Sequence, residues 1–380
     1  MLRFVGIEEM LREYKERIGC FILAGGEGSR LGNLTRNTCK PLIKVCSHYH
    51  LIDFSLINCL HFNITKLAVI VQYESIDLIN YLFESNLNSL VANFKVMPPG
   101  TKQSSDGDFA YKNTAHSVKV NMDYMVDDDN IRDILILSAD HVYSMDYDFF
   151  YRHHLEMDND LTVSVSQVSL EEASRLGVFT LDEEDNIIDF EEKPENPKSN
   201  YVSMGIYLFK KDKLKEALIE LEKSFGADLD FGEHVLPYFL ENYKVGLYKF
   251  KWYWLDVGTV YSFWKLNMSL LDHPTFIKDF FELDKRFKIN KDINNSSPSF
   301  FGENSNIKSS IIGKNSFVLG NVNHSMIGDG VVIEEDVDIL NSVVMDNCLI
   351  KKGTKIKNAV ISQDTVVEED IISDDEIICK

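Results

Sequence analysis

The segment LAGGEGSRL, Leu23–Leu31, begins at the end of the apolar run Phe21–Ala24 and places a glycine-rich loop after a buried strand. Glycines let backbone N–H groups face an anion without an intervening Cβ, and successive exposed amides form an anion-binding concavity. Arg30 adds a planar guanidinium suited to phosphate. Lys40-Pro41 follows ten residues later and places a lysine on a fixed turn. The glycines alone also fit a tight strand-to-helix turn, so the trailing Lys-Pro is what favours phosphate binding.

Two familiar phosphate loops do not fit what surrounds these glycines. A P-loop continues into Gly-Lys-Ser or Gly-Lys-Thr, which does not follow here. The dinucleotide fingerprint needs GxGxxG opening a helix, with an acidic residue about 20 positions on. This loop instead continues into Asn33-Leu34-Thr35 and the Lys-Pro pair. A hydride-transfer enzyme is therefore a poor second interpretation.

Further apolar runs on either side of amphipathic stretches extend the pattern to about residue 272. The buried strands predicted from them are Phe21–Ala24, Leu67–Gln72, Ile134–Ala139 and Val202–Phe209. Helical spacing between the runs predicts successive βα units, so we expect a Rossmann-like α/β domain with a mostly parallel sheet. Ligands of such sheets gather at the carboxyl ends of the strands.

A repeat occupies the last part of the chain. SSII, HSMI, NSVV and NAVI, at 309–312, 324–327, 341–344 and 358–361, recur at intervals of 15, 17 and 17, and an apolar residue follows each one six positions later. This spacing predicts a C-terminal left-handed parallel β-helix, with a meandering β-sandwich as the alternative. We expect residues 1–17 to be an N-terminal extension, 18–272 the α/β domain, 273–297 a polar linker and 298–380 the β-helix.

Charge and composition limit the partners and the compartment. The 380 residues carry 39 Lys and Arg against 60 Asp and Glu, a net charge of −21, which excludes the basic surface of a nucleic-acid-binding protein. With no run of about 18 apolar residues and no signal-peptide pattern, we expect neither membrane association nor export. Six cysteines without CxxC or CxxH spacing disfavour zinc or a disulfide framework and fit the cytoplasm.

Two aspartates predict a metal site. Asp140 directly follows a buried strand, and Asp256 ends an apolar aromatic run in WYWLDVGT. Carboxylates from two distant strands that converge on one ion would hold Mg²⁺ for displacement at phosphorus. A helix-capping role is the alternative for Asp140.

A charged pair predicts a second binding surface. In FEEKPE, Phe190–Glu195, a regular strand would point Glu192 and Lys193 to opposite faces. A bulge or turn at Pro194 would direct Glu192 to hydroxyls and Lys193 to a phosphate. A solvated surface hairpin explains the same residues without a ligand.

Taken in order, the motifs resemble one family. LAGGEGSRL, the Lys-Pro, LIDFSLINC, VIVQYES, LILSADHVYSMDY, FEEKPENPK, SMGIYLF, DFGEHVLP and WYWLDVGT closely resemble glucose-1-phosphate adenylyltransferase, also called ADP-glucose pyrophosphorylase, of bacterial glycogen synthesis. The resemblance runs from about residue 18 to the end. It implies a Mg²⁺-dependent nucleotidyltransferase that converts ATP and glucose 1-phosphate to ADP-glucose and pyrophosphate, usually as a tetramer of one chain or of two paralogues.

The resemblance also implies roles for residues in the matching motifs. The nucleotide side would comprise Leu23, Ala24, Gly25, Gly26, Gly28, Thr114 and Ala115. Catalytic groups would be Arg30, Lys40 and Asp140, with Asp140 and Asp256 on the metal. The sugar phosphate would be met by Gln72, Gly177, Glu192, Lys193, Ser203, Tyr207 and Asp230.

The chain departs from the family pattern at several positions. The family usually has Gly before Thr-Ala, where this chain has Asn113, and it has Gly in Ser-Gly-Asp, where this chain has Ala139. Residues 44–47 read KVCS in place of the family's PFGG. Asn37-Thr38 replaces the basic residue associated with activator binding, which puts sugar-phosphate activation in doubt. Two rival functions stay open: a pyrophosphorylase using dTTP or UTP, and a weakly catalytic regulatory subunit.

Overall fold

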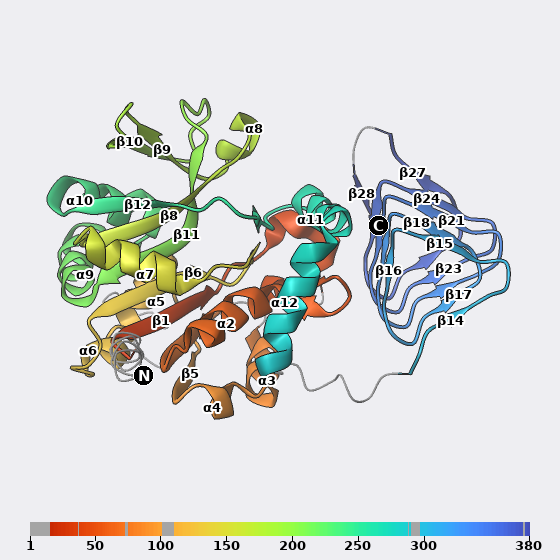
Figure 1. Ribbon diagram of the computed structural model, residues 1–380, viewed down its shortest axis with the longest axis horizontal. Helices are drawn as coiled ribbons and strands as arrows, with labels where there is room; N and C mark the ends of the chain where they lie inside the picture. The colour runs from red at the N-terminus through yellow and green to blue at the C-terminus, as the bar shows by residue number, and fades with distance from the viewer. Residues whose placement is uncertain are drawn as a thin grey trace, which may run out of the picture.

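The computed structural model describes residues 16–36, 38–72, 75–100, 110–287, 289, 297–374 and 377–380. These form an α/β domain followed by a parallel β-helix (Figure 1). Most of the expected N-terminal extension, and the later part of the expected linker, lie outside the described residues. Within the described ranges, every helix is too short or too polar to cross a bilayer.

A nine-stranded sheet forms the centre of the α/β domain, in the order β10-β9-β11-β6-β1-β4-β5, with β8 paired to β11 and β12. Its strands are β1 (Ile18–Ala24), β4 (Lys66–Val71), β5 (Asn93–Met97), β6 (Asp133–Ser138), β8 (Leu161–Gln167), β9 (Gly177–Leu181), β10 (Ile187–Glu192), β11 (Tyr201–Lys210) and β12 (Val245–Lys249). β6, β1, β4 and β5 are parallel, and β11 runs antiparallel to its neighbours. The predicted mostly parallel sheet is confirmed.

Helices cover both faces of this sheet. The longer ones are α2 (Leu51–Phe62), α3 (Ser75–Glu84), α5 (Thr114–Asn121), α7 (Tyr147–Glu156), α9 (Lys211–Phe225), α10 (Leu236–Asn242) and α11 (Val260–Asp272). Shorter turns are α4 (Leu87–Leu90), α6 (Asp123–Val126), α8 (Leu170–Ala173), η1 (Ser29–Thr35), η2 (Lys40–Leu42) and η3 (Phe231–Val235). Because successive strand residues point to opposite faces, Cys20 and Ile22 join the apolar cluster around α2, while Phe21 joins that around α5 and α9.

The first half of the expected linker is a helix, α12 (Pro274–Phe287), so the prediction of a polar connection is wrong there. Phe280 is buried and stacks on Phe54 of α2, with ring centroids 4.5 Å apart. Asp284, one turn later, is also buried, and burial together with the nearby Asp53 raises its pKa to about 6. The apolar residues of this segment recur at helical spacing, a signal that its polar composition hides.

The C-terminal domain is a stack of coils that forms three parallel sheets of five strands. One holds β14 (Phe300–Phe301), β17 (Phe317–Val318), β20 (Val332–Ile333), β23 (Leu349–Ile350) and β26 (Val366–Val367). The next holds β15 (Asn306–Lys308), β18 (Asn321–Asn323), β21 (Asp338–Leu340), β24 (Lys355–Lys357) and β27 (Ile371–Ile372). The third holds β16 (Ile311–Ile312), β19 (Met326–Ile327), β22 (Val343–Val344), β25 (Ala359–Ile361) and β28 (Ile378–Cys379).

The four predicted rungs lie in register in the third sheet, where Val344 pairs with Ile327 on one side and Ile361 on the other. Each of these repeats opens on a corner residue with a left-handed backbone, as at Asn341 and Asn358, a conformation that asparagine adopts more readily than most residues. Stacked parallel coils of this kind confirm the β-helix over the β-sandwich.

The third sheet of the β-helix faces the α/β domain. Met326, Val343 and Val360 belong to the same buried apolar cluster as the residues around α2. Lys44, in the short strand β2 (Lys44–Val45) that pairs with β3 (Tyr49–His50), donates to Asp329 at 3.0 Å and to Asp346 at 2.6 Å. The two domains therefore share one apolar core with ion pairs beside it.

Candidate active site

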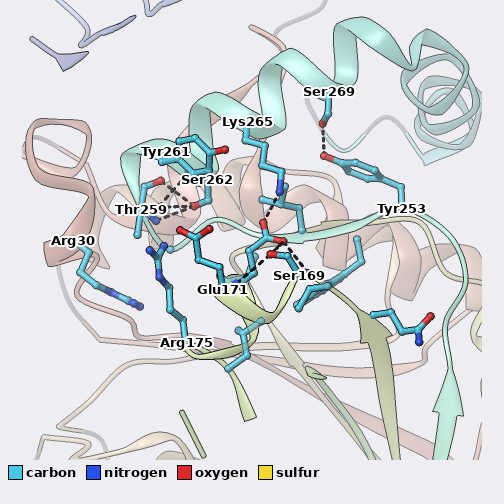
Figure 2. Close-up of a pocket in the computed structure, with 18 residues that line it drawn as sticks. Arg30, Ser169, Glu171, Arg175, Tyr253, Thr259, Tyr261, Ser262, Lys265 and Ser269 are labelled. Atoms are coloured by element: carbon cyan, nitrogen blue, oxygen red, sulfur yellow. Dashed lines mark hydrogen bonds and ion pairs between the residues drawn. The ribbon is translucent and has the colours of Figure 1, made fainter. Parts of the chain in front are cut away.

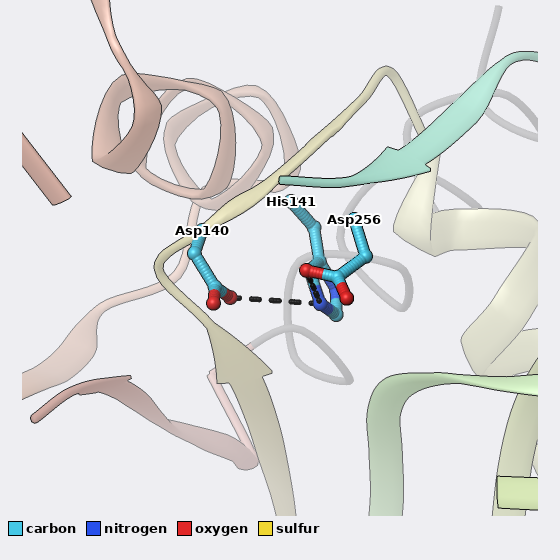
Figure 3. A group of neighbouring side chains, drawn as sticks. All are labelled: Asp140, His141 and Asp256. Carbon is cyan, nitrogen blue, oxygen red and sulfur yellow. Dashed lines mark ion pairs between the residues drawn. The ribbon is translucent and has the colours of Figure 1, made fainter. Parts of the chain in front are cut away.

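A small antiparallel sheet brings two distant carboxylates together at the end of β6. Asp140 follows β6, and β7 (His141–Tyr143) then pairs with β13 (Trp254–Asp256) so that Asp256 lies opposite His141. Asp140, His141 and Asp256 each offer a ligand atom, and these atoms lie within 4.8 Å of one another (Figure 3). The structure thus assembles the carboxylate pair on which the predicted metal site depends.

Lys40 supplies a positive charge to this cluster. Pro41 fixes the turn η2, and the buried Lys40 ammonium donates to Asp140 and lies 3.9 Å from an oxygen of Asp256. Burial alone would raise the pKa of Asp140, but Lys40, His141 and a hydrogen bond from Ser138 hold it well below its ordinary value. Burial likewise opposes the charge on Lys40, yet the two carboxylates raise the pKa of Lys40. Lys40 and Asp140 therefore form an ionised pair.

His141 belongs to the same cluster although no sequence motif indicates it. Its Nε2 lies 3.5 Å from Asp140 Oδ1 and 3.6 Å from Asp256 Oδ1, and its ring is buried edge-on against Trp254. Gly205 leaves room for this ring, since a Cβ there would lie 3.1 Å from His141 Cε1. Only the position beside Asp140 could have drawn attention to His141, because its pairing with Asp256 is a long-range contact.

The glycine loop leaves the carboxyl end of β1 beside Lys40. Gly28 has φ of 70°, and a Cβ there would lie 2.9 Å from Thr35 and 3.2 Å from the Cβ of Lys40. A side chain at position 28 would thus push the loop away from the Lys40 turn, so glycine is required for close approach. Together the loop and the turn form one wall of a cavity.

This cavity has a volume of about 350 Å³, and Asp140 forms part of its wall. Its lining includes the predicted residues Leu23, Ala24, Gly25, Gly26, Lys40, Gln72, Thr114 and Asp140. Ala115 is buried behind it in α5. Asn113, which stands where the family has Gly, also lines the cavity, and its side chain donates to the Asp228 carboxylate at the start of α5.

Gln72 differs from its predicted place. It was expected among the sugar-phosphate residues, but it lines the glycine-loop cavity, where its amide donates to the carbonyl of Tyr111 at 2.9 Å. The side chain also faces Gly25, since a Cβ on that glycine would lie 3.3 Å from the Cβ of Gln72. β4 ends immediately before Gln72 and pairs with β1, so the sheet order places Gln72 beside the glycine loop.

The predicted sugar-side residues gather around the end of β10. Strand β10 ends at Glu192, and Lys193 has φ of 47°, which turns the chain so that its ammonium lies 2.8 Å from Glu192. The Glu192 carboxylate lies over two glycines, Gly177 and Gly232, where a Cβ would approach it to 2.8 Å and 2.4 Å. The turn expected at this point is therefore present, and both side chains face the same way.

Three further residues are predicted for the sugar side, and one of them, Asp230, connects this group to the glycine-loop cavity. Asp230 caps η3 and accepts a hydrogen bond of 2.7 Å from Thr114 at the start of α5. Ser203 donates to the hydroxyl of Tyr207 at 3.2 Å, and the Tyr207 ring stacks on Phe231. The link between Thr114 and Asp230 places the two predicted binding surfaces side by side.

Comparison with known proteins agrees with this geometry. Residues 20–273 match the family model described as nucleotidyl transferase, and residues 298–375 match the model described as GlmU-like, C-terminal hexapeptide. A glucose-1-phosphate adenylyltransferase of Desulfitobacterium hafniense strain Y51 is 40% identical over 348 residues, which cover 90% of this chain and 85% of that protein. One of Bacillus cereus is 37% identical over 90% of this chain and 91% of that protein. The chain belongs to the glucose-1-phosphate adenylyltransferase family.

Membership in the glucose-1-phosphate adenylyltransferase family confirms the resemblance found in the motifs. The hexapeptide match also agrees with the predicted left-handed course of the β-helix, whose coils repeat an apolar position every six residues.

Among these family motifs, Arg30 occupies a different place from the other glycine-loop residues. Its side chain lines a second cavity of about 370 Å³, between α8 and the start of α11 (Figure 2).

Proposed function

We propose that the protein transfers the adenylyl group of ATP to glucose 1-phosphate and releases pyrophosphate. The observation that carries this proposal is the cluster of Lys40, Asp140 and Asp256 at the glycine-loop cavity, in which Lys40 and Asp140 form an ionised pair. Family membership supports the same reaction. ADP-glucose would then be the product, for glycogen synthesis.

The reaction suits a site without a general base. A phosphate oxygen of glucose 1-phosphate, already ionised, attacks the α-phosphorus of ATP. The bond from this phosphorus to the bridging oxygen breaks, and its electron pair leaves on pyrophosphate. Because no proton has to move, positioning and neutralisation of charge supply most of the acceleration. Lys40 would neutralise charge as the leaving group departs.

The carboxylate pair fits a hard divalent cation, and we propose Mg²⁺. Asp140 and Asp256 offer the oxygen ligands that Mg²⁺ prefers, and the imidazole of His141 stands between them. When bound, the cation would act as a Lewis acid on the phosphate oxygens. Lys40 holds Asp140 ionised and oriented for that ligand role.

The proposed roles on the substrate side follow the positions of the side chains. Gly25, Gly26 and Gly28 would present amides to the ATP phosphates, with Arg30 beside them, and Thr114 would lie near the base. On the sugar side, Lys193 would pair with the phosphate of glucose 1-phosphate. Hydroxyl groups of the sugar would meet the remaining predicted residues, Gly177, Glu192, Ser203, Tyr207 and Asp230. Burial and the neighbouring Glu192 act oppositely on Lys193, and the carboxylate prevails, which raises the pKa of Lys193.

Pyrophosphate release tests the function against its rivals. Purified protein is incubated with glucose 1-phosphate, MgCl₂ and ATP, UTP or dTTP in separate reactions. The proposal expects release with ATP far above that with the other two nucleotides. Preference for UTP or dTTP would assign another sugar-nucleotide pyrophosphorylase. Absence of turnover until a paralogous subunit is added would assign a regulatory subunit.

We also propose a tetramer, of this chain alone or with a paralogue. The support is family resemblance and the β-helix, whose third sheet packs against the α/β domain while its first sheet exposes Phe300, Phe317 and Val332. Light scattering of the full-length protein measures its stoichiometry. A monomer at micromolar concentration, with or without substrates, would contradict the tetramer.

A further inference from the structure

The second cavity adjoins the carboxylate cluster but lies outside both predicted substrate surfaces. Its walls are the end of β8 with α8 on one side and β13 with the start of α11 on the other (Figure 2). Of all the predicted site residues, only Arg30 and Asp256 line it. A ligand in this cavity would therefore touch the cluster from the side of Asp256, away from the residues that line the glycine-loop cavity.

Two arginines are the cationic groups available to such a ligand. Arg30 and Arg175 both line the cavity, and within the described part of the chain neither guanidinium forms an ion pair or a side-chain hydrogen bond. The third cation, Lys265, pairs with Glu172, which also accepts a hydrogen bond from Ser169. Although burial opposes ionisation, Lys265 lowers the pKa of Glu172, so this pair is neutral as a unit.

The negative charges of the lining do not cancel both arginines. Asp256 turns towards Lys40 and His141, at 3.9 Å and 3.6 Å. Glu171 is an exposed carboxylate at the rim. Arginine presents a rigid fork of donors that matches phosphate oxygens two at a time, and two such forks in one cavity favour a ligand with more than one phosphate.

Arg30 connects this cavity to the site of phosphoryl transfer. Gly258 lies beneath its guanidinium, since a Cβ there would lie 3.5 Å from Arg30 Nη2 and 3.3 Å from Asp256 Oδ2. Arg30 therefore lies against the same glycine as Asp256. The next residue, Thr259, caps α11 by accepting a hydrogen bond from the Ser262 N–H, so the positive end of the dipole of this 13-residue helix also borders the cavity. An anion that moves from the glycine loop into this cavity could therefore stay in contact with the Arg30 guanidinium.

We infer that this cavity receives the pyrophosphate, with Arg175 as its second phosphate-binding residue. The inference rests on the proposed function, in which the electron pair of the broken bond leaves on pyrophosphate. In an in-line displacement the leaving group departs on the side opposite the attacking phosphate. Lys193, which would hold the attacking phosphate, does not line this cavity, whereas Arg30 of the glycine loop does.

Calorimetry with inorganic pyrophosphate tests the inference directly. The full-length protein is titrated with pyrophosphate, with and without MgCl₂, and the Arg175→Gln variant is compared with Arg152→Gln. Arg152 is an exposed arginine on α7 that lines neither cavity, so it is the matched control. Loss of a charge-assisted pair should weaken pyrophosphate binding about tenfold in Arg175→Gln. Arg175→Lys should weaken it less, and Arg152→Gln should not change it.

Kinetics of the reverse reaction give a second measurement. Arg175→Gln should raise KM for pyrophosphate while KM for ADP-glucose stays within twofold of wild type. Unchanged pyrophosphate affinity in Arg175→Gln, or no binding to wild type, would overturn the inference even if wild type makes ADP-glucose. A weaker affinity for glucose 1-phosphate alone would also overturn it and assign the cavity to the sugar phosphate. If wild type makes no ADP-glucose in the forward assay, it is the proposed function that fails, and calorimetry still decides the ligand.

Discussion

Replacing Asp140 by Asn should abolish turnover while leaving the fold intact. Asn preserves the shape of the side chain but removes a charge that Lys40 and Ser138 hold in place. Unit charges 4 Å apart interact by about 4 kcal/mol at an effective dielectric constant of 20. Rearrangement of Lys40 towards Asp256 offsets part of this, so we expect kcat to fall by about 10²–10³, as on loss of one positioned electrostatic group.

The assay is pyrophosphate release at saturating ATP, glucose 1-phosphate and MgCl₂, with thermal unfolding of each variant as the test of folding. Asp256→Asn should cause a loss of similar size, and the double variant should lose less than the product of the two, because the carboxylates act as one unit. Asp146→Asn is the matched control. Asp146 is an exposed cap of α7, and asparagine caps a helix about as well. If Asp140→Asn retains more than about a third of wild-type kcat, the metal assignment is wrong.

Three further changes test other parts of the structure. Lys193→Gln should raise KM for glucose 1-phosphate far more than KM for ATP; an equal rise would move Lys193 to the nucleotide side, and no change would return it to a surface hairpin. Asp284→Asn should raise the Tm at pH 8 and leave it nearly unchanged at pH 4. Asp279→Asn, which replaces an exposed residue on the same helix, should leave the Tm nearly unchanged at both pH values. The sign follows because the folded carboxyl, with pKa about 6, keeps its proton to higher pH than the unfolded one, so stability falls as pH rises from about 4 through 6. An equal gain in Tm at both pH values would contradict the conclusion that the buried Asp284 carboxyl group destabilises the fold when it is ionised. A chain ending at Asn295 should aggregate and lose the proposed tetramer and any effector response, because removal uncovers the apolar surface that packs against Met326; a soluble truncated protein of unchanged stoichiometry and regulation would contradict this.

The fold could be predicted because its signals are local and repeated. The apolar runs correspond to β1, β4, β6 and β11, and the repeats at 309–361 fall at the third sheet of the β-helix. α12 departs from the predicted polar linker because the polar composition of residues 273–297 conceals the helical spacing of the aromatic residues in α12. Phe280 stacks on Phe54 of α2, as that spacing predicts.

The site could be predicted only as a set of motifs. Asp140, Asp256 and Lys40 could be selected one by one, but their convergence depends on pairing between β7 and β13, which are more than a hundred residues apart in the chain. The same pairing places His141 between the carboxylates. Gln72 lines the glycine-loop cavity although its motif predicts the sugar side, because a motif carries no information about which neighbouring strand its side chain faces. Arg175 carries no motif signal, since the cavity that it lines is formed by segments from four parts of the fold.

The most direct test of the central claim is a ³¹P NMR time course of full-length protein with ATP, glucose 1-phosphate and MgCl₂. The account predicts loss of the ATP signals with equimolar growth of pyrophosphate and of the diphosphate diester of ADP-glucose, and no such change with Asp140→Asn. Formation of orthophosphate and ADP, or growth of the diester at equal rates in wild type and Asp140→Asn, would contradict it.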